Sequence, residues 1–409
     1  MSFDIRPVTG DEFIPFSRAA DAAFGHQPTT EQMEGWRAIF EPDRSLAAFD
    51  DGRIVGTAGA VSFALTLPGL TTLPVAGVTA VGVLPTHRRQ GILTSVMRRQ
   101  LEDVRARGEA LAILYASESA IYGRFGYGLA TSMSAFDLDR RHAAFARPVE
   151  SPGRCRLLDR DEALDTLPAA YDRARRVQPG AVTRSAAWWT GLLRDPESER
   201  EGASAYWYVV YESADGQVDG FAHYRVKGQW DDGLSNNTLL LSELSAATSE
   251  AHAVLWRYLL DVDLVTTVRA ANAPVDEPLR WLLADPRRMR VTRFNDGVWV
   301  RVLDVSAALS ARRYAVSGRL ALDLADPFLP RNSGRYLLEG GPEGAACGAT
   351  TEAADLALGV SDLAAILLGG ARPSTLARAG RIVERSPGAL ARADLMFACE
   401  PLPWCGTFF

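Results

Sequence analysis

Two arginines and a glycine, Arg88, Arg89 and Gly91, stand where a buried strand is expected to lead into a helix. The β-branched run 78–83 predicts the strand, and an amphipathic run that extends to about Arg107 predicts the helix. The free amides and the positive dipole end of such a helix start attract anions. Gly91 lets the backbone approach a ligand closely, and guanidinium groups suit phosphate oxygens. The spacing predicts a phosphate-binding loop, in preference to a solvated basic helix start.

The elements around this loop are expected to belong to one α/β domain. Pro85 ends the strand because proline cannot donate to a β-ladder. In the following helix, apolar residues recur at helical steps and form a face that packs on a sheet, namely Leu93, Val96, Met97, Leu101 and Val104. Upstream, the pattern predicts helices over 11–24 and 31–40 and then three strands, over 45–49, 53–65 and 73–84.

The loop resembles a known family motif. Arg88 and Gly91 match the form (Q/R)-x-x-G-x-(G/A) of the pyrophosphate loop of GNAT acetyltransferases, although Leu93 stands where glycine or alanine is usual. The longer string VGVLPTHRRQGIL, the downstream string SESAIYGRFGYG and an aromatic chain end resemble one subfamily. This is the enhanced intracellular survival (Eis) family of actinobacterial aminoglycoside N-acetyltransferases. The resemblance runs through the whole chain.

That resemblance implies acetyl-CoA as the cosubstrate. Its binding residues would be the backbone amides of Val81 and Val83 and the loop residues Arg88, Arg89, Gly91, Ile92 and Thr94. Ser117 would contact the pantetheine arm. A helix N-cap is an equally good interpretation of Ser117, and the two roles are compatible.

The resemblance also implies a general acid for the departing thiolate. It points to Tyr122, the first tyrosine of IYGRFGY, with Tyr127 as the alternative. A phenol with a pKa near 10 is protonated at neutral pH and can donate to a thiolate. Without the resemblance, an aromatic residue in such a loop is more often part of the core.

For the general base, the family places the α-carboxylate of a C-terminal phenylalanine in the active site, and this chain ends at Phe409. A terminal carboxylate is an anion near neutral pH, so it can accept the proton of an amine, directly or through water, and hold a cation. A frayed terminus is the alternative. The apolar stretch from Trp404 to Phe409, which follows two prolines, favours docking.

An aminoglycoside or other polyamine requires an acidic cavity with aromatic walls. Phe24, Trp36 and Phe40 are the candidates for these walls. Aromatic residues at helical spacing more often belong to the core, and that alternative stays open.

Composition limits the other possibilities. With 409 residues and 47% hydrophobic content, the chain is long enough for several cores. The formal net charge of −6 argues against a protein that binds nucleic acids in general, because such binding requires a concentrated basic surface. The four cysteines are scattered without CxxC spacing, so no metal site is expected. We expect the four to be reduced thiols. The N-terminus lacks a signal peptide, and no apolar run approaches the roughly 20 residues of a membrane-spanning helix. The sequence predicts a cytoplasmic protein with no membrane partner.

Three domains are expected, in an α/β and α+β chain. Residues 1–145 would form the catalytic GNAT domain, closed by a strand through Phe136 and Leu138. Residues 146–297 repeat the element order, but the turn SAATSEA has neither arginine nor glycine, so this copy is expected to be degenerate and non-catalytic. Residues 298–409 alternate strands and helices, and by resemblance they form a sterol-carrier-like domain that ends in the catalytic C-terminus. The family also implies a homohexamer and a role in antibiotic resistance.

Two other functions compete with aminoglycoside acetylation. The protein could acetylate protein lysines, because both acceptors present a primary amine to the same donor. It could also be a lipid or protein carrier whose GNAT part is only a scaffold. An intact loop at Arg88–Gly91 together with Tyr122 favours catalysis over the carrier.

Overall fold

The computed structural model describes residues 3–409, which divide into two compact units. The first unit contains the chain up to Thr131 together with Gly297–Glu400 and Thr407–Phe409. The second contains Ser132–Asp296 and Pro401–Gly406. Each unit is therefore assembled from segments that are distant in the sequence. Among residues 3–409, no helix is both long enough and apolar enough to cross a membrane.

A seven-stranded sheet forms the N-terminal part of the first unit, with the strand order β1-β2-β3-β4-β5-β16-β6. Its strands are β1 (Asp4–Pro7), β2 (Leu46–Asp50), β3 (Arg53–Thr66), β4 (Thr72–Val83), β5 (Leu111–Tyr115), β16 (Val298–Val302) and β6 (Tyr127–Leu129). Its helices are α1 (Phe13–Ala23), α2 (Thr30–Glu34), α3 (Ile92–Ala106) and α4 (Ser119–Tyr122). β4 and β5 are parallel neighbours, and helix α3 forms the crossover between them.

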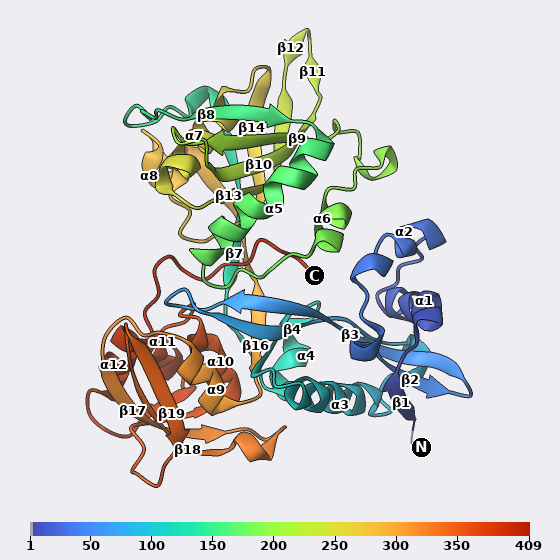
Figure 1. Ribbon diagram of the computed structural model, residues 1–409, viewed down its shortest axis with the longest axis vertical. Helices are drawn as coiled ribbons and strands as arrows, with labels where there is room; N and C mark the ends of the chain where they lie inside the picture. Colours follow the sequence, from blue (N-terminus) through green and yellow to red (C-terminus); the bar gives the residue numbers. More distant parts are fainter. Residues whose placement is uncertain (1–2) are drawn as a thin grey trace. The chain divides into compact units, whose positions relative to one another are not determined.

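Helix α3 packs against this sheet (Figure 1). Val96, Met97 and Leu101 are at most 1% exposed, so the apolar face predicted from the sequence is confirmed. A Cβ atom at Gly56 on β3 would lie only 2.7 Å from a methyl carbon of Ile92. A glycine at this position therefore lets the first turn of α3 lie directly on the sheet, which places the loop before it at the end of β4.

Two strands lie in different sheets from those expected. β7 (Ser132–Asp139), the strand through Phe136 and Leu138, does not close the first sheet but pairs with β14 and β15 in the second unit. β16, expected to begin the third domain, lies between β5 and β6 of the first sheet. Periodicity predicts a strand and its buried face, whereas the choice of sheet depends on partners far away in the sequence. Those partners leave no local signal.

The second unit contains another seven-stranded sheet, with the order β15-β7-β14-β13-β10-β9-β8. The strands besides β7 are β8 (Arg154–Leu158), β9 (Trp207–Glu212), β10 (Val218–Lys227), β13 (Asn237–Ala246), β14 (Val265–Ala273) and β15 (Met289–Asp296). Its helices are α5 (Arg160–Arg176), α6 (Ala186–Leu192), α7 (Ser249–Asp261) and α8 (Leu279–Leu282). β13 and β14 are parallel and joined by α7, as β4 and β5 are by α3. The repeated element order predicted from the sequence is present.

The C-terminal part of the first unit contains a five-stranded sheet, with the order β19-β18-β17-β20-β21. The strands are β17 (Gly318–Ala325), β18 (Gly334–Gly341), β19 (Gly344–Ala349), β20 (Leu356–Gly359) and β21 (Ile382–Glu384). The helices are α9 (Val305–Ala311), α10 (Val360–Leu367), α11 (Pro373–Arg378) and α12 (Ala389–Met396). The α+β class expected here is confirmed. After α12, the chain continues to Phe409 without a further helix or strand.

A buried ion pair links this part of the first unit to its seven-stranded sheet. Arg301 on β16 donates to Asp326 at 2.7 Å, and both side chains are fully buried. Asp326 also accepts hydrogen bonds from the Asn332 amide at 3.0 Å and from the Leu329 amide at 3.0 Å. These bonds compensate the cost of removing the carboxylate from water.

Asp326→Ala should therefore destabilise the first unit, because it leaves the Arg301 charge buried without its counterion. Breaking such a pair costs about 3–5 kcal/mol, which corresponds to a fall of roughly 6 °C or more in the unfolding midpoint. Differential scanning calorimetry measures this shift. The control is Glu343→Ala in the exposed turn between β18 and β19, which should leave the midpoint nearly unchanged. Equal midpoints for the two variants would contradict the structural role of the ion pair.

Candidate active site

A β-bulge shapes the end of β4. The register between β3 and β4 shifts between Thr57 and Gly59, and Ala80 on the opposite strand has a φ of +51°. The Thr57 hydroxyl donates to the Ala80 carbonyl at 2.7 Å and holds this conformation. On its other side, β4 pairs with β5 only from Val75 to Gly77. Beyond Gly77 that edge of β4 has no strand partner in the described sheet.

A cavity of about 610 Å³ opens beside this edge. The loop before α3 and the segment around α4 both line it. The lining residues are Ala23, Phe24, Val81, Gly82, Val83, His87, Arg88, Arg89, Gly91, Ile92, Leu93, Thr94, Ser117, Glu118, Ile121, Tyr122 and Arg124. Every residue that the sequence predicted for donor binding belongs to this set, and so does the predicted acid Tyr122.

The start of α3 is prepared for an anion. Gly91 is the N-cap, with a φ of +82°, and Arg89 before it has a φ of +64°. No side chain caps the helix, and its first turn carries no acidic residue. The amides of the first turn are therefore available to a ligand, and the dipole is not neutralised by a carboxylate. Arg88 donates to the Ala23 carbonyl at 3.0 Å and to the Val83 carbonyl at 3.4 Å, which fixes its guanidinium beside the end of β4.

Tyr122, at the end of α4, is 5% exposed and lines the cavity. Burial raises the pKa of its phenol, a hydrogen bond with Ser117 lowers it, and the nearby Glu118 charge raises it, with a net upward shift. The phenol therefore stays protonated at neutral pH and is able to donate a proton. Ser117, for which the sequence allowed either a donor contact or an N-cap, lines the cavity and contacts this phenol, whereas the N-cap of α4 is Glu118.

Tyr127, the alternative acid, lies on β6 and is not among the residues that line the cavity. Its ring meets the Tyr122 ring edge-on at 5.9 Å. The Tyr127 hydroxyl is fully buried and has no hydrogen-bond partner among residues 3–409. Burial raises its pKa strongly. The geometry therefore favours Tyr122 as the phenol that reaches a substrate.

The chain end docks on the first unit by its aromatic rings. The Phe409 ring lies 5.1 Å from that of Phe63 on β3 and 5.3 Å from that of Tyr115 on β5. A Cβ at Gly77 would approach the Phe409 ring to 3.2 Å, so glycine leaves room for this contact. Phe408 contacts Tyr115 at 4.7 Å but is 70% exposed. The structure thus has a docked C-terminus, as the apolar tail predicted, although Phe409 is not one of the cavity-lining residues.

The three aromatic residues predicted as walls of the acceptor pocket lie in three different environments. Phe24 follows α1 and lines the cavity, where it is 45% exposed. Trp36 is 60% exposed and lies in the turn after α2, away from the lining set. Phe40 packs against Phe13 at 4.8 Å and Phe16 at 5.4 Å, as part of a small hydrophobic core. For Phe40, the alternative that the aromatic residue packs in the core is the one that the structure supports.

Sequence comparison assigns three regions of the chain to known families. Residues 4–130 and 180–302 each match an acetyltransferase (GNAT) domain family, and residues 305–406 match a sterol carrier protein domain. These assignments confirm the predicted fold class of two GNAT-type domains followed by a sterol-carrier-like domain.

Relatives match along the full length. An uncharacterized N-acetyltransferase of Streptomyces avermitilis is 41% identical over 99% of both chains. The N-acetyltransferase Eis of Mycobacterium tuberculosis is 33% identical over 98% of both chains. The chain belongs to the Eis family of N-acetyltransferases. The crystal structure of Eis1 from Mycobacterium abscessus superposes on it with a TM-score of 0.87 and 34% identity, covering 99% of this chain and 100% of that one.

Two charged residues of this Eis-family cavity were not identified from the sequence. Arg124 lines the cavity, with its guanidinium carbon 4.8 Å above the Phe125 ring. It is a third arginine beside glycines, in the string GRFG, and that pattern was the available signal. Glu118 adds a carboxylate to the lining. Among residues 3–409, no group of three or more His, Cys, Asp or Glu side chains is arranged to hold a metal ion.

The equivalent helix of the second GNAT-type domain has a different start. The Thr248 side chain accepts a hydrogen bond from the Ala251 amide, and Glu250 lies in the first turn of α7. A capped amide and a nearby carboxylate both disfavour a phosphate. This geometry supports the interpretation of the second domain as a copy that does not bind the donor.

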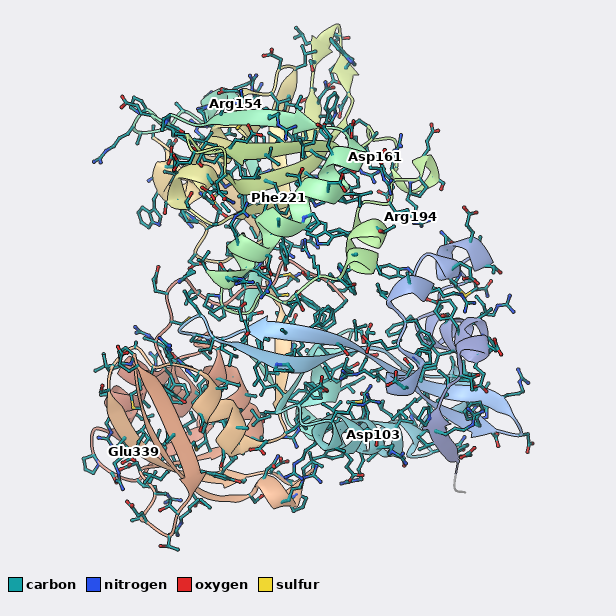
Figure 2. The ribbon with its side chains drawn as sticks, viewed as in Figure 1. Asp103, Arg154, Asp161, Arg194, Phe221 and Glu339 are labelled. Carbon is teal, nitrogen blue, oxygen red and sulfur yellow. The ribbon has the colours of Figure 1, made fainter. Side chains whose placement is uncertain are left out.

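Replacing both loop arginines, Arg88→Ala with Arg89→Ala, should weaken acetyl-CoA binding. Each lost charge-assisted contact is worth about 1.5–3 kcal/mol, a factor of roughly 10 or more in the dissociation constant. Isothermal titration calorimetry measures it. The matched control is Arg99→Ala on α3, whose side chain pairs with Asp103, labelled in Figure 2, and does not line the cavity. Unchanged affinity of the double variant would contradict the loop assignment.

Proposed function

We propose that this protein transfers the acetyl group of acetyl-CoA to primary amines of aminoglycosides or related polyamines, by direct attack in a ternary complex. One observation carries the proposal: a single cavity is lined both by the anion-accepting start of α3 and by the phenol of Tyr122. Its volume of about 610 Å³ is within the range of small-molecule sites. GNAT acetyltransferases use acetyl-CoA, and the Eis-family resemblance supplies the aminoglycoside class.

In this proposal the donor is held along the loop. The amides of Val81 and Val83, on the edge of β4 without a strand partner, bind the pantetheine arm, and Ser117 contacts it. The pyrophosphate binds at the start of α3, to the residues Arg88, Arg89, Gly91, Ile92 and Thr94. Arg124 adds a further positive charge to the same cavity.

The reaction requires two proton transfers. The neutral amine attacks the thioester carbonyl carbon, a C–N bond forms, and the tetrahedral intermediate then expels the thiolate as the C–S bond breaks. Tyr122 donates its phenolic proton to the departing sulfur. The amine nitrogen loses one proton to the α-carboxylate of Phe409, directly or through water. The products are an amide, free CoA and an enzyme in which Tyr122 has lost a proton and the Phe409 carboxylate has gained one. Proton exchange with solvent restores both groups.

In this proposal a cationic acceptor is held by one carboxylate and one ring of the cavity lining and by the chain end. Phe24 and Glu118 line it, and the Phe409 carboxylate adds an anion at the chain end. Trp36, exposed in the turn after α2, stays a prediction as a further aromatic wall. Phe40 is not proposed in that role, because its ring packs against Phe13 and Phe16 beside a small hydrophobic core.

The acceptor class can be tested directly. The protein is incubated with acetyl-CoA, a thiol reagent and a panel of aminoglycosides, and in parallel with lysine-containing peptides of matched amine concentration. Rapid thiol release with aminoglycosides and slow release with peptides supports the proposal. The reverse order would favour a protein-lysine acetyltransferase.

The division of labour among the parts belongs to the same proposal. We assign catalysis to residues 1–145 without β7 but with β16, and a non-catalytic role to residues 146–297 with β7. The sterol-carrier-like domain with the catalytic C-terminus is then the rest of residues 298–409. The family resemblance also implies a homohexamer in the cytoplasm and a part in antibiotic resistance. Light scattering coupled to gel filtration tests the assembly.

Tyr122→Phe should lower kcat by roughly 10²- to 10⁴-fold and leave the acetyl-CoA dissociation constant unchanged, because the hydroxyl acts on a charge that develops only during reaction. Because burial raises the pKa of Tyr122, the wild-type rate should not decline through this group below about pH 10. Steady-state kinetics and calorimetry measure the two quantities.

Tyr127→Phe is the matched control for that experiment. It removes a buried hydroxyl without a partner among the described residues, so kcat should stay close to that of the wild type. A silent Tyr122→Phe combined with a damaging Tyr127→Phe would show that the acid is the other tyrosine.

Changes at the chain end should abolish turnover although the other side chains are retained. Adding a few residues after Phe409 removes its α-carboxylate, and deleting Phe409 moves the carboxylate back by up to about 3.6 Å, enough to break a hydrogen bond. Aminoglycoside acetylation is measured for both variants. An N-terminal extension of equal length is the control and should be harmless. Full turnover by the C-terminally extended enzyme would show that Phe409 is only a packing residue.

A further inference from the structure

The segment Pro401–Gly406, near the end of the chain, is held inside the second unit by backbone hydrogen bonds. The Leu402 amide donates to the Asp276 carboxylate at 2.8 Å. The Gln178 side-chain amide donates to the Leu402 carbonyl at 2.8 Å. The backbone N–H and C=O of Leu402 are thus both hydrogen-bonded to side chains of this unit, which fixes the position and direction of the segment.

Two residues further on, Trp404 is held in the same way. Its backbone amide donates to the Pro179 carbonyl at 2.9 Å, and its indole nitrogen donates to the Asn272 side chain at 3.0 Å. The next residue, Cys405, is only 2% exposed. The segment therefore has a fixed register on the second unit.

Gly180 shows how closely the segment fits. A Cβ at this position would lie 2.9 Å from the Trp404 nitrogen and 3.0 Å from its carbonyl oxygen. Both atoms belong to the backbone and cannot move aside as a flexible side chain would. Gly180 also has a φ of +90°, so a larger residue would be strained and would displace Trp404 as well. We call Gln178, Pro179, Gly180, Asn272 and Asp276 the clamp.

The chain ends only three residues after this segment. Thr407 is 2% exposed, and the Phe409 ring packs on Phe63 and Tyr115 in the first unit. Between the end of α12 at Met396 and Phe409 lie thirteen residue steps without a helix or strand. A flexible chain of that length has a root-mean-square span of about 20 Å, whereas the five steps from Trp404 span about 12 Å. With Trp404 fixed, the terminal carboxylate is tethered to the second unit by only five residue steps.

We propose that the second unit, which lacks a donor loop, is a positioning device for the chain end. The clamp holds Pro401–Gly406 in register so that the α-carboxylate of Phe409 stays at the place where it removes the amine proton. This inference rests on the proposed role of that carboxylate. It makes Gly180, Asn272 and Asp276 positioning residues, which act through the Phe409 carboxylate.

The test uses the full-length protein and two readouts. Carboxypeptidase A removes C-terminal aromatic residues from accessible chain ends, so the rate of phenylalanine release reports docking of the tail independently of acetylation. Gly180→Ala, Asn272→Ala and Asp276→Ala should each raise this rate by about 10-fold, because cleavage follows the population of the undocked state. The double variant Asn272→Ala/Asp276→Ala should raise it by about 100-fold.

The second readout is kinetic. The double variant should lower kcat for aminoglycoside acetylation more than either single variant does, while the acetyl-CoA dissociation constant stays within twofold of the wild-type value. A general loss of folding would change both constants, so this separation identifies positioning.

Matched controls belong to the same unit. Gly216→Ala has the same backbone strain, with a φ of +77°, but a Cβ there has no atom within 4 Å. Asn236→Ala removes an amide that bonds to the exposed Asp231. Neither should change phenylalanine release or kcat. Calorimetric melting of all variants confirms that they are folded.

The outcomes separate the clamp from the reaction. Increased release with a reduced kcat and an unchanged donor affinity supports the proposal. Unchanged release in the clamp variants overturns the clamp and leaves the proposed reaction as it stands. Increased release with an unchanged kcat overturns the positioning role and leaves the assignment of the Phe409 carboxylate as base to the chain-end variants.

Discussion

At Ala80 the backbone of β4 enters the left-handed region, which costs a residue with a side chain about 1–2 kcal/mol. The hydrogen bond from Thr57 to the Ala80 carbonyl offsets part of that cost. The bulge lies beyond Gly77, the last residue of β4 that pairs with β5. The pairing of β4 with β5 therefore stops before the end of β4, and the loop to α3 follows that unpaired end. This interruption provides the free backbone edge beside which the cavity, the loop arginines and Tyr122 are arranged.

The two GNAT-type domains show how one topology supports different roles. In both, a helix connects two parallel strands in the sheet. The start of α3 has Gly91 as an uncapped N-terminus, whereas the start of α7 is capped by Thr248 and carries Glu250. Only the first arrangement favours a phosphate. In our proposal the second domain does not bind the donor, and its contacts around Trp404 give it a different role.

Local chemistry explains which features could be predicted from the sequence. The role of Gly91 and the two arginines before it can be predicted from their immediate neighbours alone. The same is true of the apolar face of α3. The location of β16 in the first sheet could not be predicted from neighbouring residues, because its pairing with β5 joins residues almost two hundred positions apart. The helix expected over 31–40 ends at Glu34, with Gly35 as its C-cap, and is followed by the 3₁₀ turn Arg37–Ile39. After that turn Phe40 packs against Phe13 and Phe16, which is the core alternative that its spacing had left open.

In the proposed reaction the main-chain carboxylate of Phe409 acts as the base. Cys405 allows a direct test, because a synthetic peptide of residues 405–409 can be ligated to a thioester of residues 1–404 without altering any side chain. One product carries the natural carboxylate at Phe409 and the other a C-terminal amide. We expect the amide form to bind acetyl-CoA with wild-type affinity but to acetylate aminoglycosides at least about 100-fold more slowly than the carboxylate form. Equal turnover by the two forms would contradict it.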